Sequence, residues 1–269
     1  MEIPSELIRT LRISRHIAAL TGAGISQESG LRTFRDAQTG LWAQYKPEDL
    51  ATPEAFCKNP KLVWDWYAMR REGMKQAEPN PGHYALAEMA RRALQFTLIT
   101  QNVDGLHQRA IQTLKVSAPS TSLRGCFAKT FRVLPKIVEL HGNLGRVRCF
   151  EGCGVVETWE ETSEAVPRCP LCGGYLRPDV VWFGEPLPRS ELEAAVEAAR
   201  TCDVFFSIGT SGLVQPAAAL AYAARNRGAV VVEINLEPTP VTVKADFACH
   251  GRAGEILPAL VQAVWDNPI

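Results

Sequence analysis

The chain has 269 residues, of which 46% are hydrophobic and 22% are charged, proportions that are ordinary for a globular enzyme of one or two domains. Lysine plus arginine equals aspartate plus glutamate, so the charge balance predicts neither a nucleic-acid partner nor an anionic membrane surface. No apolar run approaches the roughly 20 residues that span a bilayer, and the N-terminus lacks the apolar core of a secretion signal. We therefore expect a cytoplasmic monomer, whose eight cysteines favour metal binding or catalysis over disulfides.

Apolar strands and helices alternate along the chain. A short amphipathic helix at residues 7–14 precedes the first strand, which runs into the glycine turn of "HIAALTGAGIS". Helical spacing extends from Pro53 to about Arg92, with breaks at Pro60 and in "EPNPGH". Three more strands lie within residues 95–104, 203–212 and 229–237, and each ends in a polar or glycine-rich turn. Helices fit before and after the strand within residues 203–212.

This alternation predicts an α/β fold, a Rossmann-like parallel sheet with helices on both faces. Ligands of such sheets bind at the carboxyl ends of the strands, where all four predicted strands have polar residues or glycine. A nucleotide site is therefore predicted at this edge. Residues 111–136 fit no element, because they are basic and their first half is rich in Ser, Thr and Pro, and we expect a surface excursion or poorly ordered loop there.

Three glycines follow the first strand in "TGAGISQESGLRTFRD", at Gly22, Gly24 and Gly30. Glycines there let the backbone approach a pyrophosphate, and a following helix N-terminus favours its charge. Turns also use glycine for steric reasons alone, so the loop by itself leaves nucleotide binding open. The spacing differs from the usual dinucleotide fingerprint, and no acidic residue clearly ends the second strand, which disfavours a standard dehydrogenase.

Four cysteines form two close pairs, C-x3-C and C-x2-C, each beside glycines that permit tight turns. These are Cys149, Cys153, Cys169 and Cys172. The alternative is four unrelated buried thiols, but this pairing suits a tetrahedral zinc ion, and an all-sulfur site has no open position for chemistry, so the zinc would be structural. The isolated cysteines are expected to be ordinary buried or semi-buried thiols: Cys57, Cys126, Cys202 and Cys249.

His141 lies in "VELHGNL", just before the cysteine quartet, and a lone histidine is more often structural than catalytic. The chain, however, resembles the sirtuins, the NAD-dependent protein deacylases, in stretches that keep the family's order and span nearly its whole length. They are "GAGISQESGLRTFRD", "TQNVDGLH", "LHGN", the cysteine quartet, "RPDVVWFGE", "GTSGLVQPAA" and "INLE". The C-x3-C pair, where C-x2-C is commoner, and the length of residues 111–136 depart from the family.

The resemblance implies one sirtuin catalytic domain with two subdomains. The large NAD-binding subdomain would comprise about residues 1–40, 84–145 and 186–269. The small one would be built from a helical insertion at about 41–83 and the zinc module at about 146–185. NAD would be a consumed co-substrate, one structural Zn²⁺ would be bound, and the partners would be acylated lysine side chains of proteins.

Residue roles follow from the same resemblance. His141 would be the general base, with Asn102 also catalytic, since an imidazole with a pKa of about 6.5 suits deprotonation of a ribose hydroxyl near neutrality. The peptide channel would be bordered by Val181, Phe183 and Glu185. The implied NAD-binding residues are Gly22, Ala23, Gly24, Ile25, Ser26, Glu28, Thr33, Phe34, Arg35, Trp42, Gln101, Asn102, Val103, Asp104, Gly209, Thr210, Ser211, Asn235, Leu236, Glu237 and Ala253.

A tyrosine and an arginine in "WDWYAMRREGM", Tyr67 and Arg70, are spaced to share one helix face. The sirtuins most similar in this respect remove acidic acyl groups (succinyl, malonyl, glutaryl). A buried acyl carboxylate needs partners, and arginine offers two parallel N–H bonds while the phenol offers another. By the resemblance, the small Ala51 leaves the acyl tunnel long. The alternative is that both side chains pack and snorkel, while Arg71 is expected to be a solvated surface charge.

Two other functions compete with acidic deacylation. A mono-ADP-ribosyltransferase would use the same cleavage of NAD but needs no clamp for an acyl carboxylate. A zinc-ribbon binding module with a degenerate nucleotide fold predicts a basic, aromatic face, whereas the net charge is zero and the cysteine segment leans acidic. The clamp and the charge balance therefore favour the deacylase.

Overall fold

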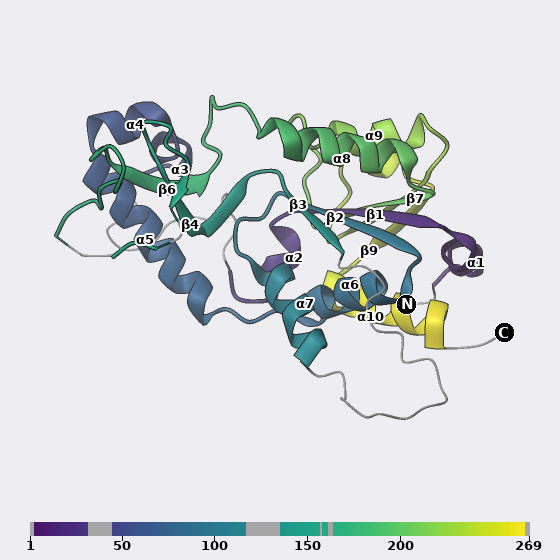
Figure 1. Cartoon of the computed structure of the whole chain (residues 1–269). Coiled ribbons are helices and arrows are strands. Elements are labelled where there is room, and N and C mark those ends of the chain that lie inside the picture. The colour runs from purple at the N-terminus through teal and green to yellow at the C-terminus, as the bar shows by residue number, and fades with distance from the viewer. Residues whose placement is uncertain (1–2, 32–44, 117–134, 157, 161–163, 267–269) are drawn as a thin grey trace.

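The computed structural model describes residues 3–31, 45–116, 135–156, 158–160 and 164–266. Its largest element is a six-stranded sheet in the order β3-β2-β1-β7-β8-β9, in which every neighbouring pair is parallel (Figure 1). The strands are β1 (His16–Thr21), β2 (Gln95–Thr100), β3 (Lys136–Glu139), β7 (Val204–Ile208), β8 (Val230–Asn235) and β9 (Phe247–His250). The predicted parallel sheet is confirmed. The edge strands β3 and β9 were not predicted, because four residues are too few for a clear periodic pattern.

Helices cover both faces of this sheet, with α8 and α9 above it and α6, α7 and α10 below it in Figure 1. The side chains of strand β1 alternate between the two faces and are apolar on both. Ile17 and Ala19 pack among side chains of α1, α6 and α10, while Ala18 and Leu20 pack among those of α8 and α9. A strand buried on both faces belongs at the centre of such a sheet. The helices are α1 (Ser5–Ile13), α6 (Pro81–Arg92), α7 (Leu106–Val116), α8 (Arg189–Thr201), α9 (Ala219–Arg225) and α10 (Ala253–Val261).

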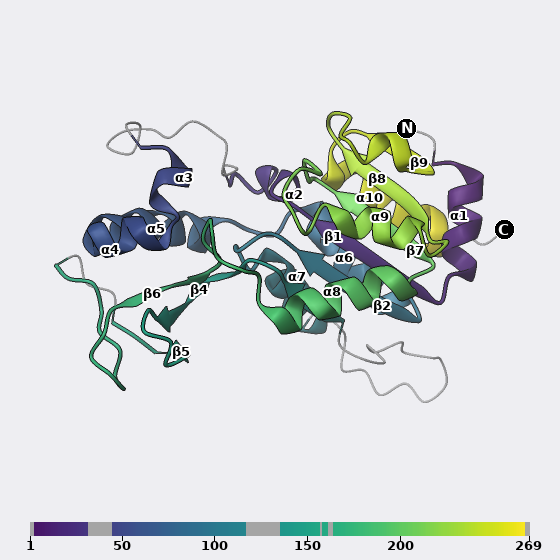
Figure 2. The ribbon, with the colours of Figure 1, turned by 90° about the horizontal axis from the view of Figure 1, so that it is seen from above.

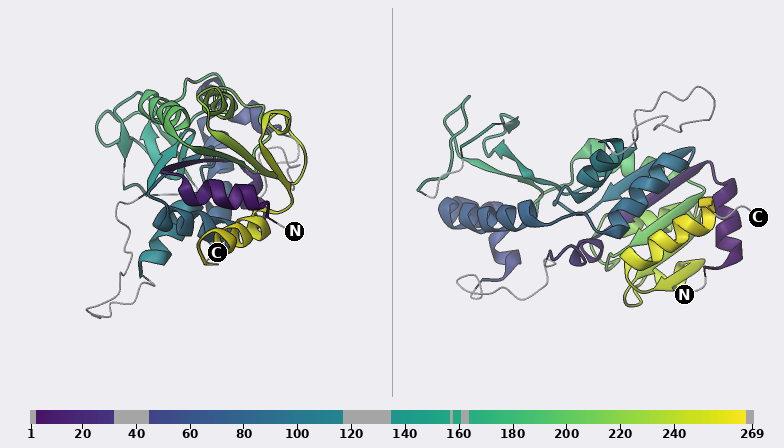
Figure 3. Two further views of the ribbon diagram at one scale, coloured as in Figure 1. Left: turned by 90° about the vertical axis from the view of Figure 1, so that its right-hand side faces the viewer. Right: turned by 90° about the horizontal axis from the view of Figure 1, so that it is seen from below.

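Helices α6 and α10 lie side by side on the lower face of the sheet, as the view from below in Figure 3 shows. Short helical segments complete this part of the molecule. The segments are α2 (Gly24–Gln27), the 3-10 helix η2 (Thr242–Lys244) and the π-helical end η3 (Gln262–Asp266). No helix in the described residues is long and apolar enough to cross a membrane.

A second, smaller sheet lies at one end of the molecule beside three helices (Figure 2). Strand β4 (Gly142–Cys149) pairs antiparallel with β5 (Val155–Val156) and β6 (Leu176–Val180). The helices are α3 (Pro47–Leu50), α4 (Pro53–Lys58) and α5 (Pro60–Gln76). One hydrophobic cluster joins the sheet to the helices, so two segments that are distant in the sequence bury each other's apolar side chains.

Proline and side-chain caps explain where the helices of this region begin. Helices α4, α5 and α6 each have proline in the first turn, behind Thr52, Asn59 and Asn80, whose side chains accept backbone N–H bonds. The helical spacing predicted from Pro53 to Arg92, with its two breaks, is confirmed.

Two expectations about the chain were wrong in part. Helix α7 covers the first part of residues 111–136, where Ile111 is buried against Ala87 and Ala110, and β3 begins at Lys136; residues 117–134 lie outside the described residues. Cys57, in the short helix α4, is exposed, whereas Cys202 and Cys249 are buried as expected; Cys126 lies outside the described residues.

Candidate active site

Two glycine loops meet where β1 and β7 end. The Gly22 N–H donates to the Ile208 carbonyl at 2.9 Å, and the Gly24 N–H donates to the Gly209 carbonyl at 2.8 Å. A Cβ built on Gly24 would lie 2.8 Å from Gly209 Cα, so a side chain there would force the two backbones apart. The sheet order reverses direction at β1 and β7, and this switch point is where α/β sheets bind nucleotides.

A cavity of about 400 Å³ opens beside these loops. It is lined by Gly24, Gln27, Glu28, Gly209, Ile234, Asn235, Leu236, Gly251, Arg252 and Ala253. Sequence reasoning predicted six of these as NAD-binding and missed Gln27, Ile234, Gly251 and Arg252. The last two follow β9, so recognition of that strand would have indicated them. Glu28 Oε1 accepts the Gly254 N–H at 3.0 Å, which ties the glycine loop to the first turn of α10.

Polar side chains after β2 reach the glycine loop. Asn102 Nδ2 donates to the Gly22 carbonyl at 3.0 Å and to Ser26 Oγ at 3.1 Å, and Ser26 Oγ donates to Asp104 Oδ2 at 2.7 Å. Asp104 also accepts the Leu106 N–H at 2.9 Å, at the start of α7. The residues predicted to line the nicotinamide pocket and the phosphate loop therefore form one hydrogen-bonded group.

A second set of bonds joins β2 to β7 and β8. Gln101 Nε2 donates to Thr210 Oγ1 at 2.9 Å, and Asn235 Nδ2 donates to the Thr210 carbonyl at 2.8 Å. Three of the predicted NAD-binding residues thus meet at the carboxyl edge, although they come from three different strands.

His141 lies two residues beyond β3, and its Nδ1 is 2.9 Å from the carbonyl oxygen of Gln101. A carbonyl only accepts, so Nδ1 carries the hydrogen and Nε2 is left as the basic nitrogen. Burial lowers the pKa of His141, and the bond to Gln101 opposes this shift. The neutral imidazole is thus the resting form at neutral pH.

The backbone around His141 is held tightly to the small sheet. The Val181 N–H donates to the His141 carbonyl at 3.0 Å. Gly142 has φ of +80°, and a Cβ there would lie 2.1 Å from the Asp179 carbonyl oxygen. Only glycine tolerates both conditions, so the "HGN" stretch places the histidine between the two sheets.

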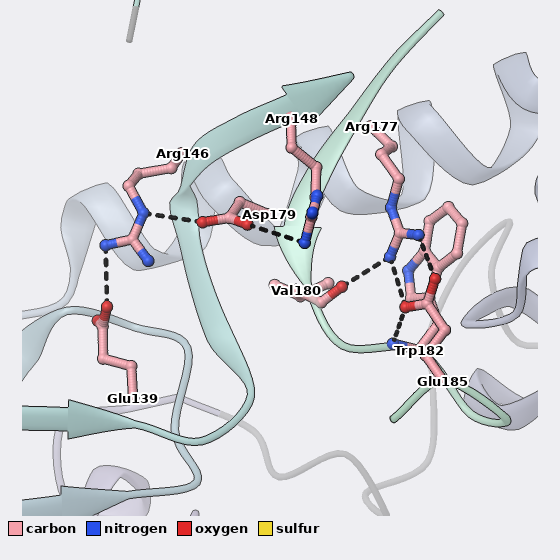
Figure 4. Close-up of polar contacts among 8 residues, drawn as sticks. All are labelled: Glu139, Arg146, Arg148, Arg177, Asp179, Val180, Trp182 and Glu185. Atoms are coloured by element: carbon pink, nitrogen blue, oxygen red, sulfur yellow. Dashed lines mark hydrogen bonds and ion pairs between the residues drawn. The ribbon is translucent and has the colours of Figure 1, made fainter. Parts of the chain in front are cut away.

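An ion-pair network fixes the junction between the two sheets (Figure 4). Arg146 donates to Glu139 Oε2 at 2.8 Å and to Asp179 Oδ2 at 2.9 Å, and Arg148 lies 3.8 Å from Asp179 Oδ1. Glu139 ends β3, while Asp179 belongs to β6. The network therefore holds the segments on both sides of His141 in register.

The four cysteines meet in the small sheet, with all their Sγ atoms within 4.8 Å of one another. The Zn–S distance of about 2.3 Å in a tetrahedral site requires sulfurs about 4 Å apart, so the quartet fits one zinc ion. Gly152 and Gly154 have φ of +91° and +111°, which lets the longer C-x3-C turn bring its second sulfur back to the site. With four thiolates, the zinc would hold β4, β5 and the segment before β6 together.

Zinc removal is expected to unfold this module while the six-stranded sheet keeps its structure. The purified chain should contain one zinc per molecule, and a strong chelator should lower Tm by on the order of 10 °C, because metal binding contributes directly to folding. Metal analysis and hydrogen exchange, read separately over β4–β6 and over β1, β7 and β8, check this. A zinc-free chain with unchanged Tm would contradict a structural metal site.

The predicted acyl clamp lies on α5. Tyr67 is 4% exposed, and its hydroxyl accepts the indole N–H of Trp182 at 3.0 Å. The Arg70 guanidinium lies over the Trp66 ring at 5.1 Å. Burial raises the pKa of Tyr67, an effect that the nearby Arg70 charge and the Trp182 bond oppose, and burial lowers the pKa of Arg70. The phenol is therefore a neutral donor beside a partly desolvated cation.

The expectation that Arg71 is a solvated surface charge is wrong. Arg71 is 3% exposed, and its guanidinium lies 4.5 Å from the ring centroid of Trp64, two helical turns earlier. Helix α5 packs inside the hydrophobic cluster of the small sheet, so more than one of its faces is covered. A buried guanidinium is accommodated there by the indole face.

The segment predicted to border the peptide channel follows β6 and lies beside Ala51. Ala51 is buried, and its carbonyl accepts the Phe183 N–H at 2.9 Å. Phe183 is half exposed, and Val181 is partly buried. The Glu185 carboxylate faces inward, where it accepts from Arg177 and from the Trp182 N–H.

The other predicted NAD-binding residues have varied settings. Ile25 is fully buried in the core, so only its backbone is available to a ligand, whereas Glu237 is exposed. Ala23 precedes α2, Ser211 follows Thr210, and the Val103 carbonyl accepts the Leu144 N–H at 2.8 Å. Four predicted residues lie outside the described residues: Thr33, Phe34, Arg35 and Trp42.

The fold and the site define a class: a Rossmann-like α/β protein with a nucleotide cavity at its switch point, a histidine at the junction of two sheets and a four-cysteine module. The Sir2 family model matches residues 22–130 and 129–216. The chain belongs to the Sir2 family, the sirtuins.

Relatives and solved structures agree with this family. An NAD-dependent protein deacylase 2 of Pyrobaculum aerophilum is 51% identical over 94% of this chain and 93% of its own length, and an NAD-dependent protein deacylase of Aquifex aeolicus is 50% identical over 88% and 90%. The crystal structure of a Sir2 homologue–NAD complex is 41% identical, with a TM-score of 0.84 over 98% of this chain and 95% of the other. A Sir2 homologue mutant in complex with 2′-O-acetyl ADP ribose has a TM-score of 0.82 at 42% identity over 98% and 97%.

Proposed function

We propose that the protein is an NAD-dependent protein-lysine deacylase that prefers acidic acyl groups and releases nicotinamide and O-acyl-ADP-ribose. The deacylase activity is supported by relatives of that name that match nearly the whole chain, and by Sir2 homologues solved with NAD and with 2′-O-acetyl ADP ribose. The acyl preference depends on one observation, the placement of the buried Tyr67 three residues before the partly buried Arg70 on α5.

The carboxyl edge of the large sheet suits NAD. The close contact of the glycine loops after β1 and β7 brings their backbone to the edge of the cavity, which suits the phosphates, and the cavity lined by Asn235 and Ala253 suits the adenosine half. The group around Asn102 and Asp104 suits the nicotinamide half. NAD supplies the ribose carbon that accepts the acyl oxygen and the ribose hydroxyl that attacks next.

His141 suits the proton transfer that this hydroxyl requires. The Gln101 carbonyl fixes the hydrogen on Nδ1, so Nε2 takes the proton. Because burial favours the neutral ring, the base is ready without prior deprotonation at neutral pH. An oriented base of this kind contributes on the order of 10²–10⁴ to the rate.

Tyr67 and Arg70 suit the distal carboxylate of a succinyl or malonyl group. A carboxylate that leaves water for the tunnel must be matched by charge and donors. Arginine supplies the charge and a two-pronged donor, and the phenol, which burial keeps protonated, supplies another hydrogen. The methyl of an acetyl group uses neither, so the clamp selects for acidic groups.

The pH profile should show the lowered pKa of His141. The active form is the neutral base, so kcat/KM is full above that pKa and falls as the pH drops through it, at a value below the ordinary 6.5. Initial rates with a succinyl-lysine peptide between pH 5 and pH 8 (about the range of histidine titration) check this. An acid limb centred above 6.5 would contradict the assigned cause.

A panel of acyl peptides tests the proposal. The protein is incubated with NAD and one peptide sequence carrying succinyl-, malonyl-, glutaryl- or acetyl-lysine, and nicotinamide and O-acyl-ADP-ribose are followed by mass spectrometry. Higher kcat/KM for acidic groups is expected. Turnover of the acetyl peptide alone would overturn the preference, and ADP-ribose attached to protein without loss of the acyl group would indicate a transferase instead.

A further inference from the structure

We propose that Trp182 is a specificity-determining residue that positions the Tyr67 hydroxyl as a hydrogen-bond donor toward the acyl group. The inference rests on the proposed function, because it explains how the acidic-acyl clamp is oriented. Trp182 follows β6 and comes from a part of the chain far from α5. Its side chain is 2% exposed, and its Nε1–H points at Tyr67 Oη, 3.0 Å away.

The direction of this bond follows from the groups involved. An indole N–H only donates, whereas a phenol hydroxyl can donate and accept. Tyr67 Oη must therefore accept from Trp182, and the hydrogen of the hydroxyl is left for another acceptor. Burial keeps the phenol protonated, since it raises the pKa of Tyr67. A carboxylate only accepts, so the hydroxyl orientation that Trp182 imposes is the one that an acidic acyl group needs.

Trp182 is itself held from two directions (Figure 4). The Arg177 guanidinium lies 3.4 Å from the centroid of the indole ring and donates to the Val180 carbonyl at 2.7 Å. The same guanidinium is paired with Glu185, whose Oε2 accepts the Trp182 backbone N–H at 2.8 Å. The Trp182 ring and its main chain are thus both held by one partly buried ion pair. The phenol is preorganised by a rigid donor, and the order needed for recognition is present before substrate binds.

Trp182 could instead serve packing alone, since its ring also contacts Phe56 at 5.4 Å between centroids. The two roles separate in Trp182→Phe, which keeps an aromatic ring in the cluster and removes the N–H. Trp64 offers a matched control, because it is fully buried in the same cluster and its ring contacts Arg71. Trp64→Phe makes the same change of ring, but the Trp64 N–H has no hydrogen-bond partner among the described residues, so no bond to the Tyr67 hydroxyl is lost.

The test is a double-mutant cycle of Trp182→Phe and Tyr67→Phe. The quantity measured for each variant is a ratio: kcat/KM for a succinyl-lysine peptide divided by kcat/KM for the acetyl-lysine peptide of the same sequence. Trp182→Phe should lower this ratio about tenfold, mainly through a higher KM for the succinyl peptide. In the Tyr67→Phe background the same change should alter the ratio by less than about twofold, because the hydroxyl it acts through is gone. Trp64→Phe should leave the ratio at the wild-type value.

The outcomes separate this inference from the function on which it rests. A wild-type ratio at or below one would overturn the proposed acyl preference and the inference with it. A wild-type preference for succinyl that survives Trp182→Phe, or a loss that is equally large in the Tyr67→Phe background, would overturn the inference alone. If Trp182→Phe does not fold, as judged by Tm, benzothienylalanine placed at position 182 replaces the N–H by sulfur in a ring of the same shape, and the same ratio decides.

Discussion

Replacement of His141 by alanine is expected to lower deacylation by two to four orders of magnitude, about the contribution of a positioned general base. The substitution removes the nitrogen that takes the ribose hydroxyl proton, together with the bond from Nδ1 to the Gln101 carbonyl that orients the ring. The measurement is kcat/KM with a succinyl-lysine peptide, beside zinc content and Tm. The zinc content should be unchanged, because His141 is not one of the four sulfur ligands.

Binding of NAD provides the control for this variant. The cavity beside Gly24 and Asn235 does not include His141, so the increase in Tm on addition of NAD should be preserved. Near-normal turnover by His141→Ala would rule out the general-base role. Loss of turnover together with loss of zinc or of the NAD-dependent Tm shift would instead show that the histidine supports the fold.

Substitution of Arg70 by methionine is expected to separate the two substrates. Loss of one charged partner of a buried carboxylate costs on the order of 2–5 kcal/mol, so kcat/KM for succinyl-lysine peptides should fall by about 30-fold or more. Deacetylation should be kept or modestly improved, because methionine fills the tunnel without a charge to desolvate. Steady-state kinetics on both peptides, with the same NAD concentration, give the two values.

Two further variants make this result specific. Arg70→Lys keeps the charge and loses the planar fork, so its loss on the succinyl peptide should lie between wild type and Arg70→Met. Arg71→Met makes the same change at the next residue, where the guanidinium packs on the Trp64 ring, and should lower Tm without changing the substrate ratio. Equal losses on both peptides in Arg70→Met would mean that Arg70 is structural.

Much of the fold was predictable because its signals are local. Continuous apolar strands followed by glycine or polar turns predicted the central parallel strands. Apolar residues at helical spacing, interrupted at Pro60 and in "EPNPGH", predicted the helices from Pro53 to Arg92. The cysteine quartet was predictable for the same reason, since two close pairs bring four thiols together once the two knuckles meet. The short edge strands β3 and β9, and most of the small sheet, were not, because their pairing depends on distant partners.

The candidate site was predictable as a set of residues and not as an arrangement. Motif order indicated Asn102, Asp104 and His141, but their functional roles stay predictions. The predicted residues between Thr33 and Trp42 lie outside the described part of the chain. Ala253 was indicated by the resemblance, but its neighbours Gly251 and Arg252 were missed, because only the sheet places them beside Gly24.

The sequence by itself determined which residues are present at workable spacings: the glycine loop, the histidine, the thiol pairs and the Tyr67–Arg70 pair on one helix face. The tertiary structure decided what each of them faces. Helical spacing places Arg70 and Arg71 one step apart, but only packing of α5 against the small sheet shows that Arg71 is buried on Trp64. The bond from Trp182 to Tyr67 joins residues 115 positions apart. Contacts at such separation depend on how distant elements pack, which no local pattern encodes, and that is why the orientation of the clamp came from the fold alone.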